Sequence, residues 1–515
     1  MKPTVRRLLA ELHGGAGALF GVILFVVLFS GCWSLGVEAL QVWARPPLPD
    51  RTGTALSIEE ILEKARDRGV ALDNVSLILP TSGQGGLRIC EGRQPCRLTL
   101  DPISGHPLLD RPSLALLKDL HKTAFIGFPG RILISLFGIA LFVLCVGGLL
   151  LLGRRWRAPW HWRRNRGGPG RREGPGRTAA VVFDLHGVIG SWIFPWLMLF
   201  ALTGALSGLG ALGTVMLSQV AYPEQPQQVF TDLLGPSPPP ASGLPLEHHV
   251  DLDRLLKADA RQFPGFTAQR LTINHGDDAA GTVEIGGIQR GLLSTSHFEA
   301  HVYRFADGAL IAEKSATDHG PWTRTFIAVQ PLHFADYSWL GRDWASWLRG
   351  VHLTAGLLAC LLCASGLHLW GLRRHRAKTW SAVVLPRLVE GVCGGLVAAA
   401  AVLLLSVQAM PLRGAGDRGL AWVFWCVWGA GVLLSLCLPR RWSLFPLYLG
   451  LAGGACLLAV GLHVEAWLGA GAWPPLAVDM TLLSCGAVLF RFFLGVARKA
   501  SSPHPIPGRI GDQNA

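Results

Sequence analysis

Residues 14–40, GGAGALFGVILFVVLFSGCWSLGVEAL, are the stretch that decides the fold of this 515-residue chain. A helix needs about 20 apolar residues to cross a bilayer, and this run supplies them. It has no clear small-x-small cleavage site, and Trp33 and Glu38 interrupt its end, so we expect a retained helix and not a signal peptide. Seven more such runs follow, at 130–152, 187–213, 350–372, 388–408, 420–438, 444–468 and 475–497. The sequence therefore predicts an α-helical polytopic membrane protein with about eight transmembrane helices.

The positive charges lie in the short segments beside these runs. The net charge is +13, and basic residues cluster at 2–7, 154–177, 373–378, 440–441 and 498–499. In an eight-span chain all of these clusters fall on one side, which is the positive-inside pattern and not a nucleic-acid-binding surface. We therefore expect both termini, the tail 498–515 and a basic loop at 153–186 in the cytoplasm. The long segments 41–129 and 214–349 are expected outside, and no nucleic acid is expected as a partner.

A repeat organises the first part of the chain. The first span starts with Leu12-His13-Gly14 and the third with Leu185-His186-Gly187, and another glycine follows each tripeptide after two residues. Each of these spans leads into an external segment. Each segment leads back to a Leu-His pair ahead of a returning span, at Leu120-His121 and Leu332-His333. The unit of helix, external domain and helix therefore occurs twice.

The two external segments match each other. Each opens with a predicted amphipathic helix, at residues 57–68 and 251–263. Strand-like stretches follow, and each segment then carries a hairpin signal, at residues 98–105 and 302–308. We expect each segment to fold as a helix with a small antiparallel sheet. Cys90 and Cys96 lie in the first segment, where an oxidising compartment allows a disulfide, although two free thiols are an equal alternative.

These features resemble a known family. The helix followed by a hairpin with Asp101-Pro102 and Gly105 is similar to the PepSY domain. The Leu-His-Gly starts, the returning Leu-His pairs and the segment SGLHLW at 365–370 resemble the PepSY-associated transmembrane family, over about residues 5 to 376. The resemblance implies a bacterial inner-membrane protein with two small α+β PepSY-like periplasmic domains. It also implies relatives among iron-regulated proteins and ferric-siderophore reductases that hold b-type haem. Residues 388–497 lie outside the resemblance, as a four-helix membrane bundle.

Histidines at the ends of the spans are the candidate cofactor ligands. An ionisable side chain in a span is costly and is a functional candidate, and neutral imidazole is a common axial ligand of haem iron. His13 and His186 occupy equivalent places in the two halves, near the cytoplasmic face, and His121 and His333 do so near the external face. We therefore predict two haem b groups, one held through its iron by each pair. The resemblance points to the same four positions.

Two other histidines are secondary candidates. His352 and His368 lie on one span, sixteen residues or about 24 Å apart, and face nearly opposite directions, so they cannot share a haem. Any single histidine among the six is also explained as a helix cap or a headgroup-level side chain, and the matched positions of four of them favour haem. His297 and His301 are expected on one face of a strand, as a solvated pair, with a metal or siderophore contact as the alternative.

The expected function follows from these ligands and from the resemblance. We find no G-x-x-x-x-G-K-[ST] and no G-x-G-x-x-G after a strand, so no nucleotide site is evident. The leading hypothesis is an electron conduit with ferric-siderophore or ferric reductase activity in iron uptake. Electrons would come from a quinol or a cytoplasmic reductase and reach ferric iron or a ferric-siderophore outside; no catalytic residue is assigned. The alternatives are a non-enzymatic PepSY-type regulator that binds a partner, and a small transporter.

Overall fold

The computed structural model confirms the expected class of membrane protein. It describes residues 3–46, 54–80, 85–92, 96, 98–153, 175–226, 228–229, 238–374, 379–410, 416–439, 443–471, 473 and 475–501. Among these residues, eight helices are long and apolar enough to span a membrane, as predicted. The chain divides into two compact units, Met1–Arg373 and Arg374–Ala515.

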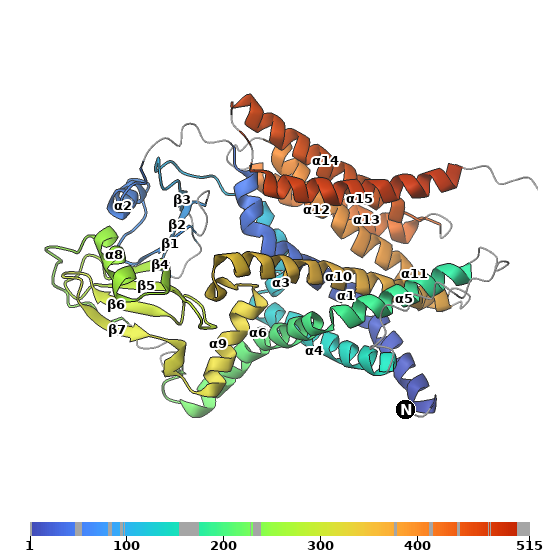
Figure 1. Cartoon of the computed structure of the whole chain (residues 1–515), viewed down its shortest axis with the longest axis horizontal. Helices are drawn as coiled ribbons and strands as arrows, with labels where there is room; N and C mark the ends of the chain where they lie inside the picture. The colour runs from blue at the N-terminus through green and yellow to red at the C-terminus, as the bar shows by residue number, and fades with distance from the viewer. Residues whose placement is uncertain are drawn as a thin grey trace, which may run out of the picture. The chain divides into compact units, whose positions relative to one another are not determined.

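The first unit contains four of the eight spans. They are the helices α1 (Pro3–Ala44), α4 (Gly127–Leu152), α6 (Phe194–Ala221) and α10 (Arg342–Arg374) (Figure 1). The third predicted span, 187–213, is interrupted: α5 (Pro175–Trp192) ends before α6 begins. Pro195 occupies the first turn of α6, where its missing N–H and the contact of its ring with the preceding turn favour a break between the two helices.

Two short helices return the chain from the external segments to the spans. They are α3 (Leu116–Thr123) ahead of α4 and α9 (Pro321–His333) ahead of α10. Each is followed by an alanine in the left-handed region, Ala124 with φ 46° and Ala335 with φ 51°. This conformation ends a helix and turns the chain sharply. His121 and His333 therefore lie on equivalent short helices at the sheet side of the spans.

The external segments form one sheet, which differs from the two separate sheets expected. Its strand order is β3-β2-β1-β4-β5-β6-β7. The strands are β1 (Val75–Ile78), β2 (Leu87–Glu91), β3 (Leu98–Leu100), β4 (Phe266–Asn274), β5 (Thr282–Gln289), β6 (Ala300–Arg304) and β7 (Leu310–Lys314). The two segments meet where β1 pairs antiparallel with β4, from Val75 opposite Ile273 to Ile78 opposite Arg270. Each of these is the first strand after the helix of its segment, so equivalent strands pair.

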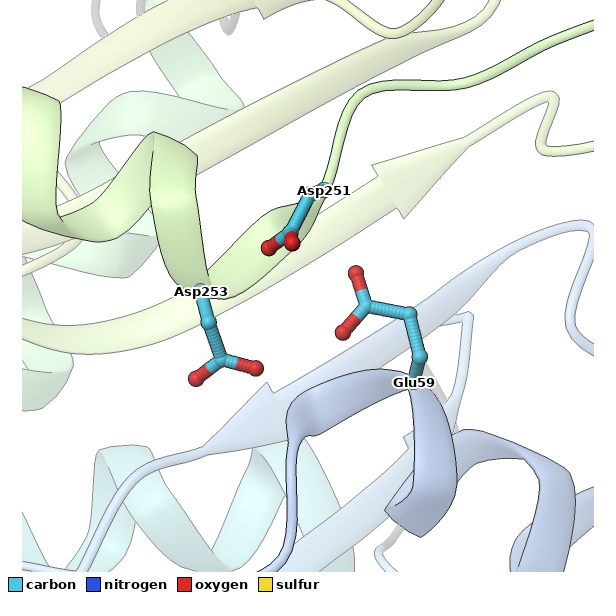
Figure 2. Close-up of side chains that lie close together, drawn as sticks. All are labelled: Glu59, Asp251 and Asp253. Atoms are coloured by element: carbon cyan, nitrogen blue, oxygen red, sulfur yellow. The ribbon is translucent and has the colours of Figure 1, made fainter.

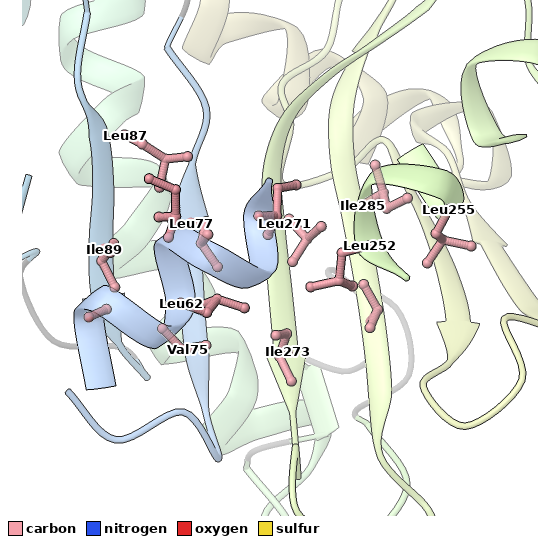
Figure 3. Close-up of a cluster of buried hydrophobic side chains, with 14 of the residues drawn as sticks. Leu62, Val75, Leu77, Leu87, Ile89, Leu252, Leu255, Leu271, Ile273 and Ile285 are labelled. Atoms are coloured by element: carbon pink, nitrogen blue, oxygen red, sulfur yellow. The ribbon is translucent and has the colours of Figure 1, made fainter. Parts of the chain in front are cut away.

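One hydrophobic core joins the two segments. The helices α2 (Ile58–Arg66) and α8 (Leu252–Gln262) lie on the same face of the sheet (Figure 3). Leu77 and Leu271, from the two paired strands, are fully buried in the same cluster as Ile61 of α2 and Leu252 of α8. Burying one such side chain is worth about 1.5–3 kcal/mol, so each half of the sheet stabilises the other through this shared core.

The local predictions for the external segments are largely confirmed. Ser57 and Glu60 form the capping box of α2, and the hairpin after Leu98 closes through an Asp101 N–H bond to the His106 carbonyl. The second hairpin joins β6 and β7 through Gly308, at φ 71°. The structure also contains the Cys90–Cys96 disulfide.

The second unit contains the other four spans. They comprise α11 (Trp380–Leu388) with its continuation α12 (Gly395–Ala409), then α13 (Gly416–Cys437), α14 (Phe445–Gly469) and α15 (Leu476–Ser501). A π-helical segment, Val389–Gly394, joins α11 to α12 just after Pro386. α14 and α15 pack closely, because a Cβ on Gly453 would lie 2.9 Å from the Gly486 carbonyl oxygen. Small residues of this kind allow helices to approach within a membrane.

Candidate functional site

The structure brings together the two histidine pairs that the repeat suggests. His13 of α1 lies beside His186 of α5, with 6.4 Å between ring centroids. His121 of α3 lies beside His333 of α9, with 6.0 Å between centroids. We call the second pair the sheet-side pair and the first the far-side pair. His13 lies on α1, and His121 hydrogen-bonds to Val27 of the same helix. Counted along α1 from His13 to Val27, the two pairs are about fourteen residues, or roughly 21 Å, apart.

Both distances suit two imidazoles that share one metal ion. With metal–nitrogen bonds of about 2 Å, two imidazoles that shared one metal ion would have their ring centres roughly 6 Å apart. The distances of 6.4 and 6.0 Å between ring centres lie close to this value. The angle between the ring planes is 74° in one pair and 17° in the other. Either angle is compatible, because each ring can rotate about its bond to the metal.

Hydrogen bonds fix the tautomer of three of these histidines. His121 Nδ1 lies 2.8 Å from the Val27 carbonyl oxygen, which can only accept, so Nδ1 carries the proton. His333 Nδ1 lies 3.0 Å from Thr203 Oγ1. That hydroxyl already donates to the Leu199 carbonyl at 2.6 Å, so it accepts from His333.

The same logic applies in the far-side pair. His186 Nδ1 lies 3.0 Å from Ser365 Oγ, whose hydrogen is directed to the Leu362 carbonyl at 2.9 Å. Nδ1 of His186 therefore donates, and its Nε2 carries the lone pair. A metal-bound histidine commonly donates its other N–H in this way, which sets the ring orientation and the basicity of the ligand. His13 differs: its Nδ1 is buried outside hydrogen-bonding geometry, near the Leu144 backbone.

A glycine lies against each of the four rings. A Cβ added at Gly31 would be 2.9 Å from Cε1 of His121, and one at Gly366 would be 3.0 Å from Cε1 of His186. The corresponding distances are 3.3 Å from Gly148 to His13 and 3.6 Å from Gly204 to His333. A side chain at the first two positions would displace the ring. The four imidazoles thus occupy space that glycine leaves open.

The secondary candidates occupy different surroundings. His352 is 3% exposed, and its Nδ1 lies 3.0 Å from the Tyr337 hydroxyl. The rings of Trp196 and Phe200 pack against it at 5.3 and 4.8 Å. His368 is exposed on α10. The structure therefore places His352 in an aromatic cage and His368 on an outward face, and the four repeated histidines form the better candidate site.

The expectation of a solvated His297–His301 pair is wrong for His301. It lies in β6, buried, with Nδ1 2.6 Å from a carboxylate oxygen of Asp259. The Tyr303 hydroxyl donates to the same oxygen at 2.7 Å, and Phe263 stacks on the imidazole at 3.7 Å. Burial and the Asp259 carboxylate raise the pKa of Tyr303. His297 lies in the loop before β6, so the two do not share a strand face.

Three carboxylates also gather on the sheet domain, where Glu59, Asp251 and Asp253 have oxygens within 4.8 Å of one another (Figure 2). Their hydrogen bonds explain the cluster. Asp251 caps α8 through the Arg254 N–H, while Glu59 and Asp253 accept N–H groups from the first residues of α8 and α2. Carboxylates are favoured at helix N-termini. We therefore interpret the cluster as helix capping.

The fold and the duplicated histidine pairs define a PepSY-associated membrane protein. The family model of the PepSY-associated TM region matches residues 10–373, and the chain belongs to this family. The match ends where the first compact unit ends. The chain is also 53% identical over 404 residues to an uncharacterized protein of Pseudomonas aeruginosa, an alignment that covers 78% of this chain and all of that protein.

Proposed function

We propose that this protein is a haem b-containing electron conduit of the bacterial inner membrane, which reduces ferric iron or a ferric-siderophore on the sheet side. The observation that carries the proposal is the pairing of four histidines at metal-sharing distances, three of them with Nδ1 donating a hydrogen bond. That tautomer leaves Nε2 available as a ligand. A structural histidine needs no second imidazole at this distance and no glycine beneath its ring.

The chain's own residues would bind and orient the cofactor. His13 and His186 would hold one group, and His121 and His333 the other. Thr203, Ser365 and the Val27 carbonyl would keep the imidazoles oriented. Haem b, when bound, supplies one-electron chemistry at a potential set by its axial ligands and their hydrogen bonds. The four histidines are half-buried against the surrounding helices, and the polarity of those surroundings would tune the potential of the bound group.

The proposed reaction is a one-electron reduction outside the membrane. Electrons come from a quinol or a cytoplasmic reductase and leave at the sheet-side pair. Fe(III) takes up one electron and becomes Fe(II), which hard oxygen ligands of a siderophore hold less tightly. The sheet domain continues directly into α3 and α9, which carry His121 and His333. An acceptor bound to that domain would therefore lie at the end of the spans where the sheet-side pair is found.

A regulatory role is the second candidate, favoured by one observation. β7 is an edge strand of the sheet, and its Leu310 and Ile311 are 36% and 47% exposed. An exposed edge can accept an extended peptide as a further strand. Under this alternative the sheet domain binds a partner protein and the spans serve as its anchor.

A visible spectrum tests the proposal. We expect protein purified in mild detergent from haem-replete cells to show sharp b-type bands after dithionite reduction. The variants His13→Ala and His121→Ala should each lose about half of the bound haem, because each removes a ligand from one pair. His368→Ala, on an exposed face, is the matched control and should keep the full content. A colourless wild-type protein would refute the conduit and leave the regulatory role.

A further inference from the structure

Two arginines occupy equivalent places in the two halves of the first unit. They are Arg131 of α4 and Arg349 of α10, and each lies seventeen residues before the glycine beneath a far-side histidine, Gly148 or Gly366. Arg131 is the fifth residue of α4 and Arg349 the eighth of α10, so both lie near the ends of these spans that follow the external segments. The repeat therefore marks the two arginines in the same way as it marks the four histidines.

Each arginine reaches a span of the other half. Arg131 Nη2 donates a hydrogen bond to the Ser207 carbonyl of α6 at 2.7 Å, and Arg349 Nη2 donates to the Leu35 carbonyl of α1 at 2.7 Å. The spans α1 and α4 flank the first external segment, whereas α6 and α10 flank the second. The exchange is therefore reciprocal, as expected of two side chains that the repeat relates to each other.

The two accepting carbonyls lie just beyond the sheet-side pair. The Leu35 carbonyl is four residues after Gly31, the glycine beneath one imidazole of the pair. The Ser207 carbonyl is four residues after Thr203, which accepts a hydrogen bond from the other imidazole. Four residues correspond to about 6 Å along a helix, and both spans continue toward the sheet domain. Along these helices, the guanidiniums therefore lie about one turn from the pair, on the side of the sheet.

The bonds to the carbonyls do not require the charge of these arginines. A guanidinium has five N–H donors and remains protonated in proteins, and a neutral side chain could donate the same single bond. Among the residues that the structure describes, no carboxylate forms an ion pair with Arg131 or Arg349. A cation inside a span is costly and is a functional candidate. Arg131 is half-buried and Arg349 is exposed, so the position is accessible from the end of the spans.

The proposed cofactor carries two anionic groups that suit these cations. Haem b has two propionate carboxylates on one edge of its macrocycle. A guanidinium binds a carboxylate through two parallel N–H bonds, which fix the direction of the ligand as well as its affinity. We propose that Arg131 and Arg349 bind the two propionates of the haem b held by His121 and His333. This inference rests on the proposed electron conduit and adds the orientation of its sheet-side cofactor, whose propionate edge faces the sheet domain.

Esterification of the propionates isolates their contribution to binding. The test uses the full chain with His13→Ala, which leaves the sheet-side pair as the haem site, produced in haem-deficient cells and purified in mild detergent. Haem b and its dimethyl ester are titrated into this parent chain, and the visible spectrum reports binding. We expect haem b to bind about 100-fold more tightly than the ester, because a hydrogen bond to a charged group contributes about tenfold or more in affinity for each carboxylate.

Arginine variants of the parent chain then assign that preference. Arg131→Gln and Arg349→Gln should each weaken the binding of haem b about tenfold and leave the affinity for the ester unchanged. In the double variant the two porphyrins should bind equally. The control is Arg324→Gln, which replaces an exposed arginine of α9 and should alter neither affinity.

The outcomes separate this inference from the conduit itself. If the variants weaken the binding of both porphyrins equally, the arginines only join the helices, and the inference is wrong although the conduit stands. Equal binding of haem b and the ester to the parent chain would also overturn it, and would leave lipid phosphates as the partners of the two guanidiniums. If neither the wild type nor the parent chain binds haem b, the conduit fails and this inference fails with it.

Discussion

Asp253 accepts the backbone N–H of Ile58 at 2.7 Å, although 195 residues separate them. The reverse bond also exists, since Glu59 accepts the Leu252 N–H at 2.6 Å (Figure 2). Each helix of the sheet domain therefore provides a carboxylate for the N-terminus of the other. The two halves of the repeat are joined by reciprocal caps at the helices and by paired strands beneath them.

These caps should contribute to stability in a coupled way. We expect Asp253→Ala to lower the free energy of unfolding of the sheet domain by about 0.5–2 kcal/mol, the usual cost of losing a cap. Glu59→Ala should cost a similar amount. The double variant should cost less than the sum, because each loss loosens the contact that positions the other cap. Thermal unfolding of the full chain measures this, with the exposed Glu63→Ala as control. Strict additivity would contradict the reciprocal arrangement.

Gly31 offers a direct test of the sheet-side pair. Its Cβ position lies 2.9 Å from His121, so Gly31→Ala should push the imidazole away and reduce bound haem by up to half. Gly36→Ala is a matched control on the same helix, where an added Cβ meets nothing within 4 Å. The pyridine haemochrome assay gives the ratio of haem to protein. Unchanged haem content in Gly31→Ala would show that His121 is not a ligand.

Thr203 should tune the electronic properties of His333. The hydroxyl accepts the Nδ1–H of His333, which makes the imidazole a stronger donor to Fe(III). Thr203→Val removes that acceptor, so we expect the midpoint potential of one haem to rise by a few tens of mV, given 59 mV per tenfold change for one electron. A spectroelectrochemical titration measures the shift. Ser365→Ala should shift the other haem in the same direction, and identical titrations for both variants and the wild type would refute this role.

Asp278 should give the sheet domain an acid-sensitive contact. The Ser242 and Ala280 backbone N–H groups and the Ser242 hydroxyl hold the pKa of this carboxyl well below its usual range. A carboxyl whose pKa is lower in the folded chain than in the unfolded chain stabilises the fold at pH values above the unfolded pKa of about 3.9. This stabilisation is lost as the pH falls below that value. Asp278→Asn should therefore unfold at a lower temperature than wild type at pH 7.

The difference in stability between Asp278→Asn and wild type should narrow as the pH falls below about 4, because the unfolded wild-type chain then takes up a proton at this carboxyl while the folded chain does not. Thermal unfolding across a pH series measures both effects. The exposed neighbour Asp277→Asn serves as control. If the difference in unfolding temperature between Asp278→Asn and wild type stays constant down to pH 3, the carboxylate charge of Asp278 does not contribute to stability.

The histidine pairs were predictable because the repeat marks them. His13 and His186 follow the same leucine and precede the same glycine, so symmetry suggests that they meet. Their hydrogen-bond partners were not predictable. Ser365 and Thr203 sit on other helices, at positions that no spacing rule links to the histidines, and serine or threonine in a helix usually bonds its own backbone.

The single sheet was missed for a different reason. β1 and β4 are far apart in the chain, and a strand pattern shows which face is buried but not which strand lies alongside. The interruption before α6 was available in the sequence, because Pro195 lies inside the predicted third span. Nothing in the sequence next to Asp479 indicates that His463, sixteen residues earlier, is its hydrogen-bond partner.

The pairing of β1 with β4 also bears on biosynthesis. The strand Val75–Ile78 leaves the ribosome long before its neighbour Phe266–Asn274 exists. Until the later segment has been synthesised and has folded against them, the early strands have an open edge and half a core. The first segment must wait in an unfinished state, so truncation between the halves would leave a product prone to aggregation.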